Sequence, residues 1–126
     1  MGTVAVESKL GTYLHQIQGP ARGVYQCEPA THSDLWVNYL VHREDLCKKI
    51  NRNTTSYFAL NQNDELVFNL KYATVICRAH YLRVPKPLPN EEDIEGLGQY
   101  WKTYYNTKLG KDSVKKFVDA YQVYCQ

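Results

Sequence analysis

The sequence predicts a single, mainly α-helical domain with about five helices and at most a short hairpin. A chain of 126 residues is long enough to bury a core of its own. Apolar residues recur at helical spacing in several stretches, and each stretch is bounded by residues that start or stop helices. The sequence has no run of about 18 apolar residues and no basic N-terminal region before an apolar segment, so we predict neither a membrane span nor a signal peptide.

The first two helices are predicted from residues that can close or cap them. Residues 1–11 have the pattern of the end of a helix that Gly11 closes. A second helix is expected over 34–50, with Ser33 or Asp34 as its N-cap. Its apolar side carries Trp36, Tyr39, Leu40, Cys47 and Ile50.

A polar segment and a proline series delimit the third helix. The Asn-rich stretch 51–66 predicts a loop, with room for a short hairpin. The helix itself is expected over 68–83 and ends before Pro85, Pro87 and Pro89. Its predicted apolar stripe is Phe68, Tyr72, Val75, Ile76, Ala79 and Leu82.

Two more helices are expected in the C-terminal third. One covers 91–106, starts after Asn90 and is followed by a break at Gly110. Its predicted buried residues are Ile94, Leu97, Trp101, Tyr104 and Tyr105. The last covers about 113–124, with the apolar residues Val114, Phe117, Val118, Tyr121 and Tyr124.

Charge and cysteine content exclude several classes of function. A net charge of +2 is too small to indicate a nucleic-acid-binding protein. The more basic C-terminal end is interpreted as a solvated helix face, with attraction to an anionic polymer as the alternative; its lysines are Lys102, Lys108, Lys111, Lys115 and Lys116. The cysteines are too far apart in sequence for a zinc pair or a redox motif, so no metal or cofactor is predicted. Buried free thiols are expected for Cys27, Cys47, Cys77 and Cys125, with disulfides as the alternative.

Glu7 is the first candidate for a chemical role. It lies in an apolar run about one turn before the expected end of the first helix. The negative end of the helix dipole and the loss of hydration both favour a protonated carboxyl there. A carboxyl that stays neutral near pH 7 is suited to act as a general acid. The alternative, a surface glutamate on an amphipathic helix, is left open by position alone.

The residues after Glu7 follow a pattern that points to a family. Glu7 and Ser8 are followed by GPARGVYQCEPAT, which resembles the signature of lysozyme-like lytic transglycosylases and goose-type lysozymes. In that family a Glu-Ser pair at a helix end precedes a Gly-rich turn, a Gln and a Pro-x-Thr that opens the next helix. FNLKYATVICRAHYL resembles the family's Asn-Ile/Leu helix, and YYNTKLGKDSVKKFV resembles its Tyr-Asn turn. The resemblance thus covers nearly the whole chain.

The resemblance implies a lysozyme-like catalytic domain and assigns roles to five residues. Glu7 would protonate the glycosidic oxygen and then act as a base. Gln26 would bind near Glu7 or the sugar, Ser8 would orient the substrate, and Tyr105 with Asn106 would line the opposite wall. The implied substrate is peptidoglycan, cut at the β-1,4 bond between N-acetylmuramic acid and N-acetylglucosamine. A member of the family without an export signal also resembles phage or prophage products that reach the periplasmic cell wall by another route.

The sequence departs from the family pattern in three places. Only six residues precede Glu7, which leaves open that the domain over 1–126 lacks an N-terminal segment. Cys27 and Glu28 occupy the two variable positions before Pro29, where the family more often has apolar residues. Asp112 stands where a glycine is expected.

The number of catalytic acids distinguishes two mechanisms. A two-carboxylate hydrolase needs a second acid across the cleft. Glu28, Asp34 and Asp64 are each open candidates, whereas a transglycosylase needs only Glu7 because the substrate's own hydroxyl closes a 1,6-anhydro ring. Transglycosylation is therefore favoured. The alternative class is a non-catalytic cell-wall-binding or phage structural protein with the same fold.

Overall fold

The computed structural model describes residues 1–55, 62–107 and 109–126, which fold into one mainly helical domain. The only β pairing in these ranges consists of isolated bridges that join Arg22 to His15 and to Cys27. No helix in the described part of the chain is long and apolar enough to cross a membrane. The helices are α1 (Gly2–Ser8), α2 (Pro29–Asn38), η1 (Leu40–His42), α3 (Glu44–Asn51), α4 (Gln62–Phe68), α5 (Leu70–Leu82), α6 (Ile94–Trp101), η2 (Lys102–Asn106) and α7 (Val114–Cys125).

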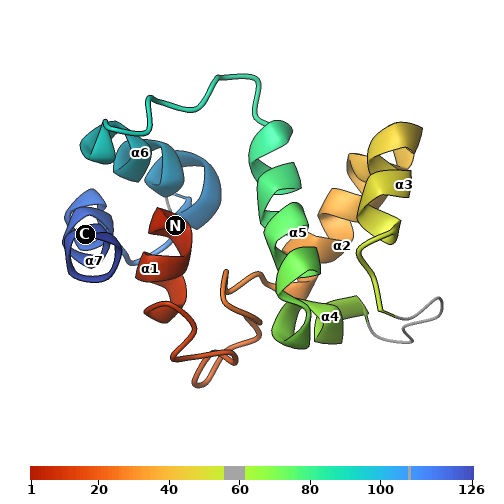
Figure 1. Cartoon of the computed structure of the whole chain (residues 1–126), viewed down its shortest axis with the longest axis horizontal. Coiled ribbons are helices and arrows are strands. Elements are labelled where there is room, and N and C mark those ends of the chain that lie inside the picture. The colour runs from red at the N-terminus through yellow and green to blue at the C-terminus, as the bar shows by residue number, and fades with distance from the viewer. Residues whose placement is uncertain (56–61, 108) are drawn as a thin grey trace.

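The helices form two lobes, each with its own apolar core. Figure 1 shows α1, α6 and α7 gathered with both chain termini in the first lobe, and α2 to α5 in the second. The core of the first lobe is formed by Val6, Trp101 and Phe117. The core of the second lobe is formed by Cys27, Leu35, Leu40, Ile50, Leu66, Tyr72, Ile76 and Ala79.

The lobes are connected along the chain and through side chains. The proline-containing segment 83–93 crosses from α5 to α6 (Figure 1). The α5 residue Tyr81 stacks on Tyr105 of η2 with ring centroids 5.4 Å apart, and its hydroxyl lies 2.9 Å from the Thr3 hydroxyl of α1. Offset aromatic pairs of this kind add stabilisation beyond the area that they bury. Helix α5 therefore contacts both cores.

Helix α1 ends earlier than the sequence predicted. It stops at Ser8, and Lys9 and Leu10 both adopt left-handed backbone angles, with φ of 50° and 55°. Gly11 follows with φ of 90°, so the predicted closure at Gly11 is the last residue of a longer reversal. Left-handed conformations at non-glycine residues are costly and need support from the surrounding structure. This reversal leaves Glu7 in the last turn of α1.

The single helix predicted over 34–50 is wrong. The chain instead forms α2, the short η1 and α3, with breaks at Tyr39 and Arg43, whose φ angles are −129° and −133°. Helix α2 begins at Pro29, a residue suited to the first helical turn because it lacks an N–H. Leu40 in η1 is fully buried, so the apolar pattern continues through the break and hides it.

Part of the predicted loop over 51–66 is also helical. Helix α4 spans Gln62–Phe68, and a polar residue within it finds partners inside the fold. The buried carboxylate of Glu65 accepts bonds from the backbone and hydroxyl of Thr55 and from the Asn69 amide. Phe68 belongs to this helix and is largely exposed, so its predicted place in the apolar stripe of the next helix is wrong. A short hairpin was considered for the stretch 51–66, of which residues 56–61 lie outside the described residues.

The remaining helix boundaries follow their capping residues. Asn69 caps α5 by accepting from the Tyr72 N–H, and Asp93 caps α6 by accepting from the Gly96 N–H. Ser113 caps α7, which begins within one residue of the predicted start. Helix α6 starts three residues later than predicted, and its last turn widens into the π-helical η2.

All four cysteines are free thiols, as expected, but the expected burial holds for only two of them. Cys27 and Cys77 are buried, whereas Cys47 and Cys125 are only partly buried. Burial raises the pKa of Cys27 and of Cys77 to about 12, so both stay protonated near neutral pH. These thiols act as small apolar side chains.

Candidate active site

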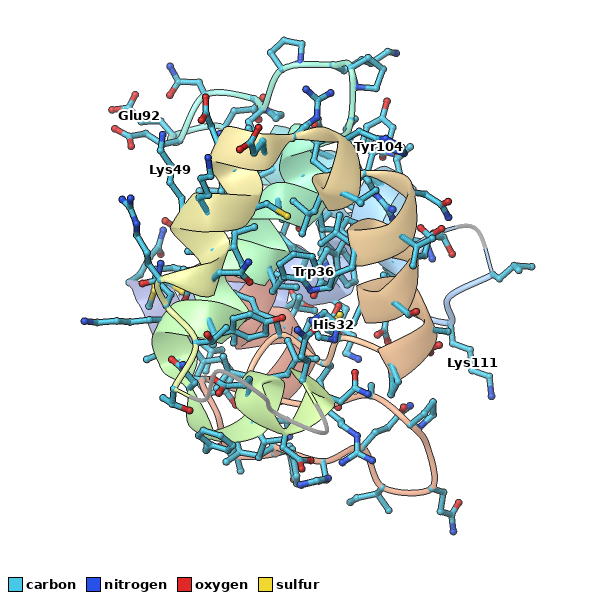
Figure 2. The ribbon with its side chains drawn as sticks, turned by 90° about the vertical axis from the view of Figure 1, so that its right-hand side faces the viewer. His32, Trp36, Lys49, Glu92, Tyr104 and Lys111 are labelled. Atoms are coloured by element: carbon cyan, nitrogen blue, oxygen red, sulfur yellow. The ribbon has the colours of Figure 1, made fainter. Side chains whose placement is uncertain are left out.

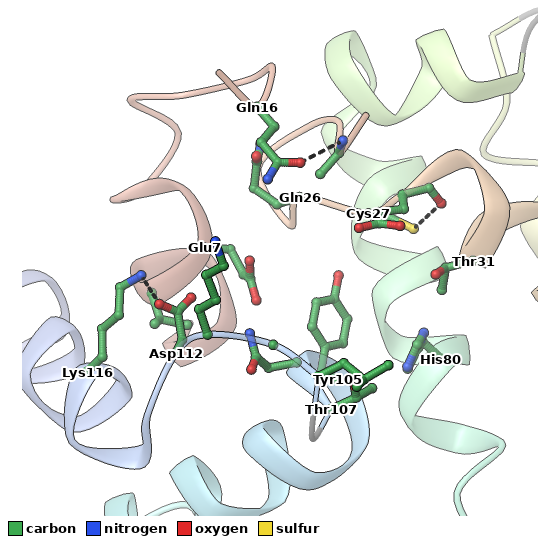
Figure 3. A pocket seen from close by; sticks show the side chains of 17 residues that line it. Glu7, Gln16, Gln26, Cys27, Thr31, His80, Tyr105, Thr107, Asp112 and Lys116 are labelled. Carbon is green, nitrogen blue, oxygen red and sulfur yellow. Dashed lines mark hydrogen bonds and ion pairs between the residues drawn. The ribbon is translucent and has the colours of Figure 1, made fainter. Parts of the chain in front are cut away.

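A cleft of about 730 Å³ lies beside the C-terminal end of α1, and four of the five residues to which the family resemblance assigns roles line it: Glu7, Gln26, Tyr105 and Asn106. Segments from both lobes line it: the end of α1, the loop before α2, α5, and the chain from η2 to α7 (Figure 3). A volume of this size lies within the range of about 300–1,000 Å³ that is typical of ligand-binding clefts. Its lining residues are Val6, Glu7, Gln16, Ala21, Gln26, Cys27, Glu28, Thr31, His80, Tyr105, Asn106, Thr107, Leu109, Gly110, Lys111, Asp112 and Lys116.

Glu7 reaches the cleft from the last turn of α1. The preceding residue, Val6, packs into the first lobe with Trp101 and Phe117, which fixes the rotation of the helix. One carboxyl oxygen of Glu7, Oε1, accepts a 2.9 Å hydrogen bond from Trp101 Nε1. Trp101 is 1% exposed, so this donor is held rigidly by the core. The carboxyl is therefore oriented by a buried donor.

The surroundings of Glu7 favour its protonated form. Burial raises its pKa from 4.5 to about 7. The hydrogen bond from Trp101 lowers the pKa, the negative charge of Asp112 raises it, and the positive charge of Lys116 lowers it. A carboxyl that titrates near pH 7 can both donate and take back a proton at neutral pH. This matches the sequence-based expectation for the ionisation of Glu7, although burial and not the helix end is the main cause.

Ser8 lies away from the cleft, which corrects the expectation that it orients the substrate. Its side chain is fully buried, and its hydroxyl donates to the Val4 carbonyl at 3.2 Å. The same hydroxyl accepts from the Gly11 N–H at 2.9 Å. Ser8 therefore closes the end of α1 and supports the reversal that follows Glu7.

Gln26 does line the cleft, and its side chain also holds the loop in shape. Its Nε2 donates to the carbonyl oxygens of Gly23 at 2.9 Å and Tyr13 at 3.3 Å. Its backbone is left-handed, with φ of 46°, and lies between Arg22 and Cys27, whose backbone groups exchange two 3.0 Å hydrogen bonds. The loop is thus a tight hairpin-like turn that presents Gln26 on the same side as Glu7.

Tyr105 and Asn106 both line the cleft from η2. The Tyr105 hydroxyl donates to the Tyr25 carbonyl at 2.7 Å, which ties η2 to the loop before α2. Burial raises the pKa of Tyr105 well above 10, so it stays a neutral donor. Single turns of π-helix are frequent at functional sites because they re-aim the side chains of a helix. The structure thus brings Glu7, Gln26, Tyr105 and Asn106 together around one space.

Lys102 supports the part of the cleft that Asn106 lines, which the sequence did not predict. Its ammonium donates to Asn106 Oδ1 at 2.7 Å, to the Thr107 carbonyl at 2.9 Å and to the Gly110 carbonyl at 2.7 Å. The three donors of an ammonium are therefore all used within one turn of chain. The sequence-based prediction placed Lys102 in a solvated basic helix face. Nothing in the sequence indicated that its ammonium would hold the segment from Asn106 to Gly110.

The structure shows which of the candidate second acids line the cleft and which lie outside it. Asp34 pairs with Arg83 at 2.7 Å and Asp64 lies 3.9 Å from Arg22, and neither lines the cleft. Glu28 lines the cleft and is exposed at the start of α2. Asp112 also lines it, and was noted in the sequence only as a departure from glycine. That departure was the signal that could have identified a further acid.

The described residues of the cleft do not form a group that could bind a metal ion. In the described ranges, no three histidine, cysteine, aspartate or glutamate side chains are grouped so as to hold one. His80 lines the cleft, but one of its ring nitrogens lies 2.9 Å from the Tyr104 carbonyl, and burial lowers its pKa. The chemistry available to the described residues is proton transfer by Glu7, with neutral and charged hydrogen-bonding groups around it.

Comparisons with models of protein families, with curated proteins and with solved structures find no match to this chain.

Proposed function

We propose that this protein is a glycosidase that cleaves the β-1,4 bond between N-acetylmuramic acid and N-acetylglucosamine in peptidoglycan. The observation that carries the proposal is Glu7, a carboxyl with a pKa of about 7 that faces a cleft and is oriented by Trp101. The motif around Glu7, Gln26 and the Tyr105–Asn106 turn resembles lytic transglycosylases and goose-type lysozymes.

The proposed reaction begins with proton donation. Protonated Glu7 gives its proton to the glycosidic oxygen as the bond from that oxygen to C1 of the muramic acid breaks. The resulting carboxylate then takes a proton from the C6 hydroxyl of the same sugar while that oxygen bonds to C1. The products are a free 4-hydroxyl on one fragment and a 1,6-anhydro ring on the other, and Glu7 is protonated again. No water is consumed.

The other cleft residues suit the binding of a sugar chain. Asn106 keeps its side-chain amide nitrogen for a ligand, because Lys102 occupies only its oxygen in the described residues. Gln26 Nε2 is engaged with two carbonyls, which leaves its oxygen as the acceptor toward the cleft. Neutral amides of this kind bind the hydroxyl and acetamido groups of a glycan.

The first prediction tests Glu7 directly. Glu7→Gln should reduce the lysis of isolated cell walls by about 10²-fold or more, because an amide can accept from Trp101 but cannot donate and recover the proton. Lysis is followed as loss of turbidity of a wall suspension. Glu91→Gln removes an exposed carboxyl outside the cleft and serves as the matched control.

Two outcomes would contradict the proposal. Lysis by folded Glu7→Gln at the wild-type rate would exclude Glu7 as the acid. Binding of the wild-type protein to walls without any cleavage would instead favour the non-catalytic wall-binding or phage structural protein. Circular dichroism of each variant separates loss of activity from loss of the fold.

A further inference from the structure

His80 is a nearly buried histidine of α5 that lines one end of the cleft. Its side chain is covered on most sides, and the residue is only 7% exposed. Figure 3 shows the Tyr105 ring between Glu7 and His80, and the rings of Tyr105 and His80 have centroids 4.9 Å apart. His80 therefore borders a part of the cleft that the proton transfer by Glu7 does not use.

The backbone of η2 fixes which ring nitrogen of His80 carries a proton. Nε2 lies 2.9 Å from the Tyr104 carbonyl oxygen, which can only accept, so Nε2 is the donor. Burial lowers the pKa of His80, so the ring binds no second proton at neutral pH. In this neutral tautomer Nδ1 carries a lone pair and acts as an acceptor.

The acceptor Nδ1 has no partner in the protein but is not sealed from solvent. In the described part of the chain, Nε2 is the only atom of His80 that forms a hydrogen bond. Among the same residues, the one buried side-chain nitrogen or oxygen without a partner is Arg22 Nε, so solvent reaches His80 Nδ1. Because His80 is otherwise covered and lines the cleft, we infer that Nδ1 is open toward the cleft.

The surroundings of His80 suit a ligand group that combines a donor with an apolar end. Figure 3 shows Cys27 and His80 at the same end of the cleft, away from Asp112. Cys27 keeps its thiol protonated, because its pKa is raised to about 12, and the Tyr105 ring adds further apolar surface. An acetamido group has an N–H for the acceptor and a methyl group for these surfaces, whereas a hydroxyl group has only the donor.

We propose that His80 determines specificity for N-acetylated glycans, with Nδ1 accepting a hydrogen bond from the acetamido N–H of a sugar near the cleaved bond. The inference rests on the proposed glycosidase function, whose substrate carries an acetamido group on every sugar. His80 does not touch the reacting atoms in this role. Its contribution is to the affinity for the correct polymer, because a buried acceptor without its donor is unfavourable.

Two substitutions distinguish the roles of the two ring nitrogens. In His80→Gln the longer amide can still donate to the Tyr104 carbonyl, as Nε2 does, but the acceptor at Nδ1 is lost. In His80→Asn the shorter amide places its oxygen near the position of Nδ1 and loses the bond to Tyr104. The two variants therefore lose opposite functions, and circular dichroism shows whether each is folded.

The test measures by titration calorimetry the binding of two β-1,4-linked tetramers that contain no muramic acid, one of N-acetylglucosamine and one of glucose. The glucose tetramer keeps ring hydroxyls but has no acetamido group. His80→Gln should weaken binding of the N-acetylglucosamine tetramer by about 5-fold or more and leave binding of the glucose tetramer unchanged, and His80→Asn should lose less. His42→Gln changes an exposed histidine outside the cleft and is the matched control, which should alter neither affinity.

Every other pattern would overturn the proposal. Greater loss in His80→Asn, or equal loss in both variants, would mean that the bond to Tyr104 or the ring itself matters. An unchanged affinity in His80→Gln would exclude Nδ1 as an acceptor for the glycan, and equal losses for the two tetramers would show that it binds a hydroxyl group. No binding of the N-acetylglucosamine tetramer by the wild-type protein would also overturn it.

Failure of the proposed function is recognised separately, from wall lysis. Full lysis by Glu7→Gln, or no lysis by the wild-type protein, would reject the glycosidase. Neither readout depends on which tetramer is bound. A protein that binds the N-acetylglucosamine tetramer through His80 without lysing walls would keep this site and lose the catalytic assignment.

Discussion

At the scale of single residues, the hydrogen bond from Trp101 orients the Glu7 carboxyl and influences its pKa. The indole N–H reaches Oε1, which leaves the other carboxyl oxygen, Oε2, to carry the transferable proton toward the cleft. A hydrogen bond to an ionised group contributes about 1.5–3 kcal/mol, so this donor favours the carboxylate left after proton transfer. Burial acts in the opposite direction and is the larger influence on the pKa of Glu7. The balance between them sets the acidity of the site.

Trp101→Phe should therefore raise the pKa of Glu7 above about 7. The loss of a charged hydrogen bond of about 1.5–3 kcal/mol corresponds to a shift of about 1–2 pH units. Because the protonated form is the active acid, the alkaline limb of the pH–rate profile should move to higher pH. The maximal rate should fall at the same time, since the carboxylate product is less stabilised. The measurement is wall lysis between about pH 5 and 9.

Trp36→Phe is the matched control for this change. Trp36 also donates its indole N–H, 3.0 Å from the Tyr72 hydroxyl, but it lies in the second lobe near His32, away from the cleft (Figure 2). This variant should lose stability without moving the pH–rate profile. A profile that moves equally in both variants would mean that the shift reflects general loosening and not the bond to Glu7.

At the scale of elements, the loop between α1 and α2 is the part of the fold with the tightest geometric demands. It carries Gln26 into the cleft and joins the two lobes. Gly23 has φ of 74°, and a Cβ on it would lie 1.9 Å from the Leu66 carbonyl oxygen. Gly11 has φ of 90°, but the nearest atom to its Cβ, on Val24, is 3.4 Å away. The two glycines thus share a backbone conformation and differ in the space around them.

Alanine substitution at the two glycines should distinguish the free-energy cost of a left-handed backbone from the additional cost of a steric clash. Gly11→Ala should cost about 1–2 kcal/mol of unfolding free energy, the usual price of a left-handed backbone at a residue with a Cβ. Gly23→Ala should cost clearly more, because the loop must also move away from the backbone of α4. Denaturant unfolding of both variants measures the difference, and equal losses would show that the Gly23 contact can relax freely.

At the scale of the whole molecule, the buried titratable groups make stability depend on pH. Burial lowers the pKa of His32 and of His80 below 6.5, so each stays neutral in the folded protein. His32 is held between the Asn63 side chain at 2.9 Å and the Tyr72 hydroxyl at 2.7 Å. Glu7 behaves in the opposite way, because its folded pKa is raised to about 7. Compared with the unfolded chain, the folded protein thus binds protons less readily at His32 and His80 and more readily at Glu7.

The sign of each contribution follows from proton linkage. As pH falls through about 6.5, unfolded histidines take up protons that the folded protein does not bind, so stability falls. Between 4.5 and about 7, folded Glu7 holds a proton that the unfolded chain has released, so its contribution falls as pH rises. The free energy of unfolding should therefore be greatest near neutral pH.

Glu7→Gln should change this profile in a defined way. Above about pH 7 the variant should be more stable than the wild-type protein, because it no longer buries a charge. Between about pH 5 and 6.5 its stability should fall more steeply with acidity, by up to about 1.4 kcal/mol per pH unit, because the opposing proton uptake is gone. Denaturant unfolding across pH 5–8 tests this, and parallel curves for the two proteins would contradict a buried neutral Glu7.

The sequence was sufficient for the class of fold and for some of its boundaries. Apolar periodicity and capping residues are local signals, so α7 and the end of α5 were predicted within one residue. The break between α2 and α3 was missed because buried Leu40 keeps the apolar pattern continuous through it. Helix α4 was missed because the buried partners that Glu65 finds in Thr55 and Asn69 cannot be read from a polar sequence.

For the candidate site, the sequence by itself determined which residue types are available and that Glu7 ends a helix beside a turn-rich segment. Tertiary structure decided which of them meet. Glu7 is bonded to Trp101, 94 positions later in the chain, and only this packing desolvates the carboxyl and raises its pKa. The same packing buries Ser8 away from the cleft and brings Asp112 to it. Desolvation and charge coupling depend on distance in space, so they appear only when segments remote in sequence are packed together.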